Sequence, residues 1–125
     1  SYPQEWMEYY TKHGLVLRDP TVRWGFENTG HQRWSALTDD ASAEMMATAA
    51  DHGLRFGVTI ALVEEGSRTV ASYARADREF TDPEIARLNG LTVHLHHLTI
   101  AGETLSPQDH DKLKQMSVLL THPVA

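Results

Sequence analysis

The sequence predicts an α+β fold in which an antiparallel sheet is packed between helices. Residues 54–63 and 68–76 alternate their side chains between two faces, as strands do, and the residues 64–67 between them predict a hairpin turn. Helix signals precede and follow this hairpin, and no helix separates its two strands. The order of helices, hairpin and helices is typical of α+β domains.

Three helices are expected before the hairpin, over residues 3–13, 20–28 and 41–52. The residues that favour the start of each helix are Pro3, Pro20 and Asp40. Those that favour its end are Gly14, Gly30 and Gly53. Between the first two helices, residues 15–17 are expected to run extended into Asp19-Pro20, because the residue before a proline is disfavoured in the α region.

The hairpin and the helices after it carry equally local signals. One face of the first strand would hold Phe56, Val58, Ile60 and Leu62, and the other face would hold Gly57, Thr59 and Ala61. On the second strand, one face would hold Ala71 and Tyr73, and the other Val70, Ser72 and Ala74. Thr81 and Glu84 form a capping box, which predicts a helix with an apolar stripe that Ala101-Gly102 interrupts. A last helix is expected from Ser106, with Leu113, Met116 and Leu120 on one side.

Composition bounds the classes of function. A chain of 125 residues with 41% hydrophobic and 22% charged residues fits one globular domain. The net charge of −6 argues against nucleic-acid binding by this chain alone, because phosphates attract a surplus of Lys and Arg. There is no cysteine, so disulfides and thiolate chemistry are excluded. No apolar run approaches the ~20 residues that span a bilayer, and we expect a cytoplasmic protein without membrane contact.

The sequence offers no strong catalytic motif. The cluster His94, His96 and His97 is the densest of eight histidines, but it lacks the i, i+4 spacing of helical zinc sites, so exposed or interface histidines are the favoured interpretation. A metal-dependent enzyme using this cluster is the weaker alternative. Neither a Gly-x-Ser-x-Gly nucleophile elbow nor a phosphate-binding glycine loop is present. We therefore predict a protein that is not an enzyme and needs no cofactor.

Aromatic residues gather at the N-terminus, beside one carboxylate. Tyr2, Trp6 and Tyr10 are spaced by four, so they share one side of the first helix, and Asp19 and Trp34 follow. Buried Tyr and Trp each keep one polar atom that seeks a partner, and a carboxylate accepts from an N–H. Spacing alone leaves two interpretations open: a structural aromatic core with Asp19 as a helix cap, or the wall of a small-molecule pocket.

These residues resemble the autoinducer-binding domain of LuxR-type quorum-sensing regulators. The resemblance rests on "SYPQEWMEYY", "RDPTV" and the following Trp34, and it continues into "GLRFGVTIAL". It implies a GAF/PAS-like α-β-α sandwich over residues 1–104 that binds an N-acyl-homoserine lactone. It also implies a ligand-binding set: Tyr2, Trp6, Tyr10, Asp19, Thr21, Trp34, Thr59, Ala71 and Tyr73.

The resemblance also implies a role for each part of the ligand. Trp6 would donate to the lactone carbonyl, and Asp19 would accept from the amide N–H. Tyr2 would hydrogen-bond the acyl amide carbonyl or a 3-oxo group, and Thr21 would line the head-group region. Tyr10 would pack along the acyl chain, and Trp34 against the lactone ring. Tyr73 is bulkier than the small residue common in the family, and Ser72 replaces it at the pocket if the hairpin is shifted by one residue.

The two ends differ from the family pattern. Residues 105–125 resemble the start of a helix-turn-helix with Gln108-Asp109 in place of the usual Arg-Glu, and family elements that precede Tyr2 are expected upstream of Ser1. We expect no direct DNA binding by this chain. The predicted role is a sensor that is part of a larger LuxR-type regulator, or a stand-alone receptor or anti-activator without DNA binding. Such a receptor would dimerise with itself, or pair with a full-length relative and silence it. The alternative is a ligand-free dimerisation module with a degenerate pocket.

Overall fold

The structure, a computed structural model, describes residues 2–37, 40–101 and 119–123. Its helices are α1 (Gln4–Lys12), α2 (Pro20–Glu27), α3 (Asp40–Asp51) and α4 (Asp82–Ala101), with 3-10 turns η1 (Leu15–Leu17) and η2 (Trp34–Ala36). Its strands are β1 (Gly30–Arg33), β2 (Phe56–Glu64), β3 (Ser67–Arg75) and β4 (Leu119–Pro123). All neighbouring strands pair antiparallel in the order β1-β2-β3-β4.

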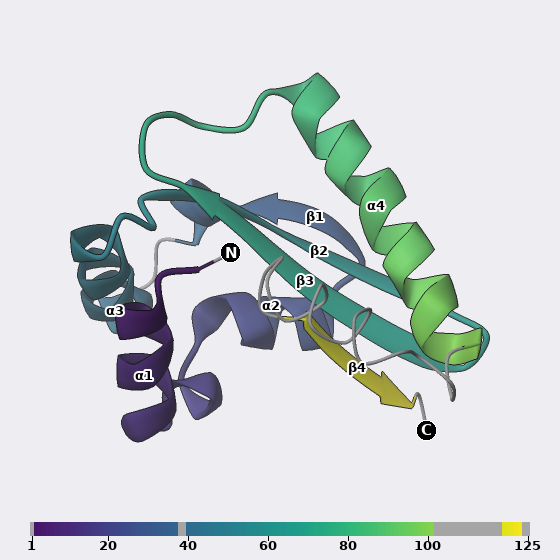
Figure 1. The fold of residues 1–125 in the computed structure, drawn as a ribbon, viewed down its shortest axis with the longest axis horizontal. Coiled ribbons are helices and arrows are strands. Elements are labelled where there is room, and N and C mark those ends of the chain that lie inside the picture. The colour runs from purple at the N-terminus through teal and green to yellow at the C-terminus, as the bar shows by residue number, and fades with distance from the viewer. Residues whose placement is uncertain (1, 38–39, 102–118, 124–125) are drawn as a thin grey trace.

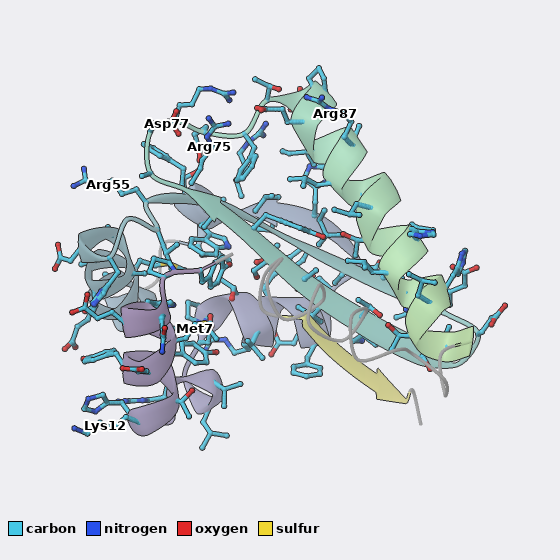
Figure 2. The ribbon with its side chains drawn as sticks, in the orientation of Figure 1. Met7, Lys12, Arg55, Arg75, Asp77 and Arg87 are labelled. Carbon is cyan, nitrogen blue, oxygen red and sulfur yellow. The ribbon has the colours of Figure 1, made fainter. Side chains whose placement is uncertain are left out.

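The chain forms three layers (Figure 1). The helices α1, α2 and α3 lie on one face of the sheet, and the long helix α4 crosses the other face. Charged side chains such as Lys12, Arg55 and Arg87 project from the outside of these layers (Figure 2). The predicted α+β class, with an antiparallel sheet between helices, is therefore confirmed.

The hairpin of β2 and β3 forms as its alternation predicts. Both residues of its tight turn have positive φ, 54° at Glu65 and 73° at Gly66, which matches the right-handed twist of the strands that it joins. Thr59 pairs with Ser72, and Ile60 pairs with Ala71. Because paired residues share a face, this register divides the hairpin into a face toward α1–α3 and a face toward α4.

Two hydrophobic clusters follow this division. The first joins Trp6, Tyr10 and Trp34 with residues of η1 and α3. The second contains five buried residues between the sheet and α4: Val58, Ile60, Ala71, Tyr73 and Ile85. The sheet thus has an apolar layer on each side, as a domain of this architecture requires.

The helix ends follow the capping chemistry of the sequence. Asp19 caps α2, whose first residue is Pro20. The capping box before α4 forms in both directions: the Thr81 backbone N–H donates to Glu84 Oε1 at 2.9 Å, and the Glu84 N–H donates to Thr81 Oγ1 at 3.3 Å. At the other end of α2, Arg68 donates from β3 to backbone carbonyls of Gly25 and Asn28, at 2.8 and 2.6 Å.

Three local predictions need correction or remain outside the described residues. Residues 15–17 form the 3-10 turn η1 and not an extended segment. Leu120, placed by its spacing in a last helix, lies in β4 opposite Val70. The start of that predicted helix at Ser106, with Leu113 and Met116, falls outside the described residues, as does most of the segment 105–125.

Candidate ligand-binding site

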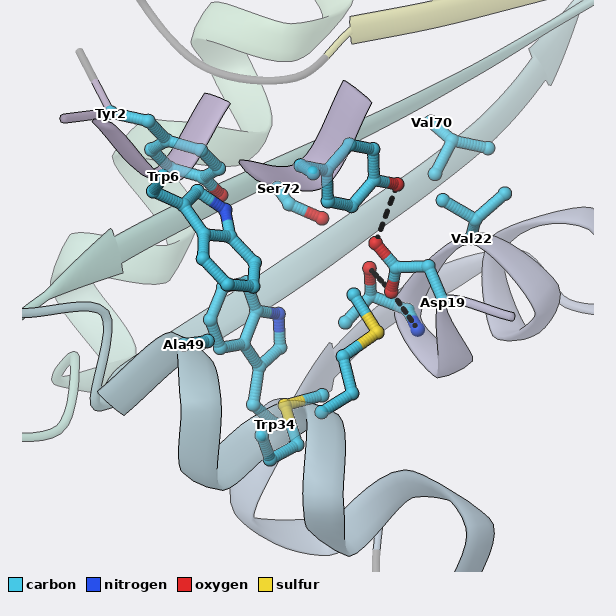
Figure 3. Close-up of a pocket in the computed structure, with 12 residues that line it drawn as sticks. Tyr2, Trp6, Asp19, Val22, Trp34, Ala49, Val70 and Ser72 are labelled. Atoms are coloured by element: carbon cyan, nitrogen blue, oxygen red, sulfur yellow. Dashed lines mark hydrogen bonds between the residues drawn. The ribbon is translucent and has the colours of Figure 1, made fainter. Parts of the chain in front are cut away.

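A partly open cavity lies between α1, α2, α3 and the sheet (Figure 3). Its volume is about 30 Å³, which is room for one or two water molecules. Six residues that the sequence predicted for the site line it together: Tyr2, Trp6, Tyr10, Asp19, Thr21 and Trp34. These residues lie in α1, α2 and η2, or in the segments that precede α1 and α2.

Asp19 is the charged group of this cavity. Its side chain is held by three donors: Tyr10 Oη at 2.8 Å to Oδ2, and the Thr21 backbone N–H and Oγ1 at 2.8 and 2.6 Å to Oδ1. A carboxylate offers about four acceptor positions, so one position on Oδ2 is left for a further donor. The same contacts that cap α2 therefore orient an acceptor toward the cavity.

Tyr10 keeps its proton in this arrangement. Burial raises the pKa of Tyr10, and the nearby Asp19 carboxylate and its hydrogen bond raise it further. Burial likewise raises the pKa of Tyr2, with a smaller contribution from Asp19. Both phenols are thus neutral hydrogen-bond donors at physiological pH.

One buried donor at the cavity has no partner among the described residues. The Tyr2 hydroxyl is buried and unbonded, which is uncommon because an unpaired buried polar group costs roughly 1–3 kcal/mol. Trp6, a residue only 3% exposed, also lines the cavity and carries one N–H donor on its indole ring. Figure 3 shows the Trp6 nitrogen and the Tyr2 hydroxyl on the same side of the cavity. The site therefore offers donors at one end and a carboxylate at the other.

Trp34 forms the floor of the site and is fixed by the sheet. Its Nε1–H donates to Thr59 Oγ1 at 3.0 Å, and Thr59 in turn shares a hydrogen bond of 2.7 Å with Ser72 Oγ. The ring lies so close to Gly57 that a Cβ at that position would overlap three indole atoms. Because its N–H is already bonded, Trp34 presents only its ring surface to the cavity.

The sheet residues of the predicted set divide between the two faces. Thr59 faces the cavity side but lies behind Trp34 and is not part of the lining. Ala71 and Tyr73 point to the opposite face, where Tyr73 Oη bonds Thr92 Oγ1 at 2.8 Å. The expectation that these two side chains border the pocket is therefore corrected: Ser72 lines it in their place. The physical reason is the register, which pairs Thr59 with Ser72 and so puts both neighbours of Ser72 on the α4 side.

Other lining residues were missed in the sequence. They are Val22, Met45, Met46, Ala49 and Val70. Val22 follows Thr21 in the same helical turn, and Val70 shares a strand face with Ser72, so the observed register that selects Ser72 also selects Val70. The two methionines have no comparable signal, because the sequence does not reveal which side of α3 faces the sheet.

The histidine cluster is distributed over different environments. His96 is fully buried and hydrogen-bonds Thr69 Oγ1 and the backbone carbonyl of Glu64. The His97 ring contacts the Glu64 carboxylate at 2.9 Å, and His94 is exposed. Within the described ranges, no group of three or more His, Cys, Asp or Glu side chains is arranged to hold a metal ion. The described part of the chain likewise contains no helix long and apolar enough to pass through a membrane.

Comparison with known proteins identifies similar sequences and folds. Residues 1–98 match the family described as "Autoinducer binding domain". The transcriptional activator protein SolR of Ralstonia nicotianae is 31% identical over 102 residues, which are 81% of this chain and 43% of SolR. The chain thus spans less than half the length of that relative.

Solved structures share the fold at lower identity. The LuxR family transcription factor CepR2 of Burkholderia cenocepacia superposes with a TM-score of 0.61 at 24% identity, covering 81% of this chain and 62% of CepR2. SdiA of Escherichia coli superposes with a TM-score of 0.64 at 24% identity, covering 92% of this chain and 54% of SdiA. A further structure of SdiA is a complex with octanoyl-rac-glycerol, with a TM-score of 0.62.

Proposed function

Because the chain belongs to the family of LuxR-type autoinducer-binding domains, we propose that its cavity binds an N-acyl-homoserine lactone and that this binding regulates transcription. It is a ligand-binding domain and not an enzyme, as predicted. The observation that carries the proposal is the buried, unbonded Tyr2 hydroxyl in the same cavity as the Trp6 indole and the Asp19 carboxylate.

An acyl-homoserine lactone complements these groups, and the walls of the cavity, which now leave room for only one or two water molecules, must move apart to admit it. It has two carbonyl acceptors, one on the ring and one on the amide, and a single amide N–H donor. Trp6 and Tyr2 supply the two donors, and the remaining acceptor position of Asp19 takes the amide N–H. The Trp34 ring gives the lactone a flat apolar contact. A hydrogen bond to a charged group contributes about 1.5–3 kcal/mol, so Asp19 makes the largest polar contribution to head-group affinity.

Similar proteins support the class of ligand. CepR2 is described as N-acylhomoserine lactone dependent, and SdiA is seen with octanoyl-rac-glycerol, which also joins a small polar head to an acyl chain. An acylglycerol has no amide N–H to place on Asp19. Its free hydroxyl groups can donate to Asp19 instead, so the acylglycerol is a competing head group and a useful comparison ligand.

The proposal includes the wider assembly. The sensor acts as the ligand-binding part of a LuxR-type regulator, or as a receptor that pairs with a full-length relative, and in both cases as a dimer. Because this chain has a net charge of −6, we assign DNA contacts to a partner or to another domain and not to this chain. Size-exclusion chromatography with and without a lactone tests the dimer.

A pair of matched phenol deletions tests the ligand site. Tyr2→Phe removes a hydroxyl that has no partner in the protein, so stability should be unchanged or higher while lactone affinity falls about tenfold, the equivalent of one lost hydrogen bond. Tyr73→Phe removes a hydroxyl bonded to Thr92 on the other face, so stability should fall while lactone affinity is unchanged.

Isothermal titration and urea unfolding of the purified chain measure both quantities, with lactones from butanoyl to dodecanoyl and an acylglycerol as ligands. Lactone binding that is equally sensitive to both substitutions would contradict the assigned site. Absence of binding by every lactone would refute the proposed function and favour a ligand-free dimerisation module.

A further inference from the structure

An imidazole ring outside the cavity lining packs against Trp6. The ring centroids of Trp6 and His52 are 5.3 Å apart and the ring planes are inclined at 51°, within the range that aromatic pairs prefer. The rings of Tyr9 and Tyr10 also lie near the indole, at 6.0 and 5.9 Å, but these residues belong to the same helix as Trp6. His52 therefore gives Trp6 a contact from another part of the fold.

The backbone of His52 is fixed at the end of α3. The Gly53 N–H donates to the Ala50 carbonyl at 3.0 Å, and Gly53 has a φ of 87°. The Leu54 N–H donates to the Ala49 carbonyl, also at 3.0 Å. These are the two hydrogen bonds of a Schellman motif, a helix end in which glycine supplies the left-handed residue. Leu54 and Ala49 are both buried in the first core cluster, which anchors this turn in the core.

The side chain of His52 is fixed as well. Its Nδ1 lies 2.9 Å from the Thr48 carbonyl oxygen, and because a carbonyl oxygen only accepts, Nδ1 carries the hydrogen. Thr48 lies in the last turn of α3, where backbone carbonyls lack the usual partner within the helix. The hydrogen bond to Thr48 and the packing on Trp6 thus hold the imidazole in one orientation.

The Trp6 indole needs such a support to aim its N–H. The outer side-chain torsion of tryptophan joins a tetrahedral carbon to a planar ring, and its energy minima are broad. The backbone of α1 therefore does not by itself determine where the indole N–H points. Trp6 is only 3% exposed, so the direction is decided by the side chains packed around the ring. Among these, His52 is held by α3 and does not move with α1.

We infer that His52 is a positioning residue, which holds the Trp6 indole in the orientation that lets its N–H meet the lactone carbonyl. This inference rests on the proposed function and adds a residue that contacts Trp6 and does not line the cavity. Without the imidazole, the indole has more freedom to rotate, and ordering it on binding costs part of the free energy of the hydrogen bond. Only a ligand that has the ring carbonyl loses affinity in this way.

Two probe ligands that differ by one carbonyl isolate this hydrogen bond. They are an N-acyl-homoserine lactone and its tetrahydrofuran analogue, in which a methylene replaces the ring carbonyl. Isothermal titration of the purified chain with both probes gives the ratio of their affinities, at the acyl length from butanoyl to dodecanoyl that binds the wild type most tightly. A general loss of stability lowers both affinities and leaves this ratio unchanged, whereas a misdirected indole lowers the ratio.

The expected ratio differs between variants. The wild type should prefer the lactone about tenfold, the equivalent of one hydrogen bond, and Trp6→Phe should reduce this ratio to about one. His52→Ala should reduce it to about twofold or less, whereas His52→Phe, which keeps a ring against Trp6, should retain at least about fivefold. The matched control is His13→Ala: His13 packs on Tyr9 at 4.4 Å, and the ratio should stay within about twofold of the wild type.

Thermal unfolding shows whether each variant is folded, and His52→Leu replaces His52→Ala if the latter is not. A ratio near the wild-type value in the variant without the ring would show that His52 only stabilises the fold. A fall in His13→Ala as large as that in His52→Ala would show that the whole aromatic group, and not His52, holds the indole. A ratio in His52→Phe as low as in His52→Ala would refute ring packing as the cause.

A wild-type ratio near one, or an unchanged ratio in Trp6→Phe, would show that the indole does not meet the ring carbonyl. Each of these results overturns the inference while lactone binding, and with it the proposed function, stands. Failure of every lactone to bind the wild-type chain is a separate result, and it would remove the proposed function together with this inference.

Discussion

The substitution Gly57→Ala tests whether the floor of the cavity is held by one close contact. Gly57 lies on β2 directly beneath the Trp34 indole, and an added Cβ would overlap three atoms of that ring. The backbone at Gly57 is not in the left-handed region, so alanine is acceptable to the main chain and the cost is steric alone. The indole must therefore move away from the sheet.

The magnitude follows from what that movement disrupts. Overpacking of a core costs about 1–3 kcal/mol, and loss of the Trp34 Nε1–Thr59 hydrogen bond adds about 0.5–1.5 kcal/mol. Replacing glycine lowers the entropy of the unfolded chain and returns about 0.4–1 kcal/mol. We expect a net decrease of about 2–3 kcal/mol in the free energy of unfolding.

A double-mutant cycle in urea unfolding separates this contact from a general effect of alanine. In the background Trp34→Leu, the ring that blocks the Cβ is gone, so Gly57→Ala should have little cost and the coupling free energy should be about 2 kcal/mol or more. Intrinsic fluorescence follows the transition in the single mutant. Equal costs in the two backgrounds would refute the contact as the cause.

Two further predictions concern polar contacts outside the cavity. Arg68→Met removes the donors to the carbonyls of Gly25 and Asn28 at the end of α2 and should lower the free energy of unfolding by about 1–2 kcal/mol. The control Arg87→Met, on the exposed side of α4 (Figure 2), should change that free energy by less than about 0.5 kcal/mol. Similar losses in both variants would contradict the capping role of Arg68. The pKa of Glu84 is lowered from 4.5, chiefly by its hydrogen bonds with Arg78 and then by the capping backbone N–H. The ionised Glu84 stabilises the fold fully above about pH 4.5, and this stabilisation is lost as the pH falls toward the lowered pKa. The difference in Tm between the wild type and Glu84→Gln should therefore shrink on acidification. A difference that stays constant with pH would count against the ionised contact.

The sequence predicted those elements that local signals specify. The helix α4 begins at the capping box of Thr81 and Glu84, and the hairpin follows the alternation of its side chains. The strands β1 and β4 were missed, because "GHQR" and "LLTHP" form strands only by pairing with β2 and β3. Pairing with a distant strand is a property of the tertiary structure that no short window of sequence contains.

The site residues on helices and helix caps were predictable from the sequence, whereas those on the sheet were not. Tyr2, Trp6 and Tyr10 reach the cavity because helical spacing puts them on one side of α1, and Asp19 reaches it because it caps the next helix. Sheet residues were harder, because the face of a strand residue depends on the residue at which the hairpin turns. Ser72 was an alternative that only the observed register selects.

The tight turn of the hairpin has an effect beyond the strands that it joins. If one residue were inserted into it, β3 would shift against β2, and the hydroxyl of Ser72 would be directed into the apolar layer under α4 while an alanine or tyrosine side chain entered the ligand cavity. The chemical character of the recognition surface therefore depends on two residues, Glu65 and Gly66, that contact no part of it.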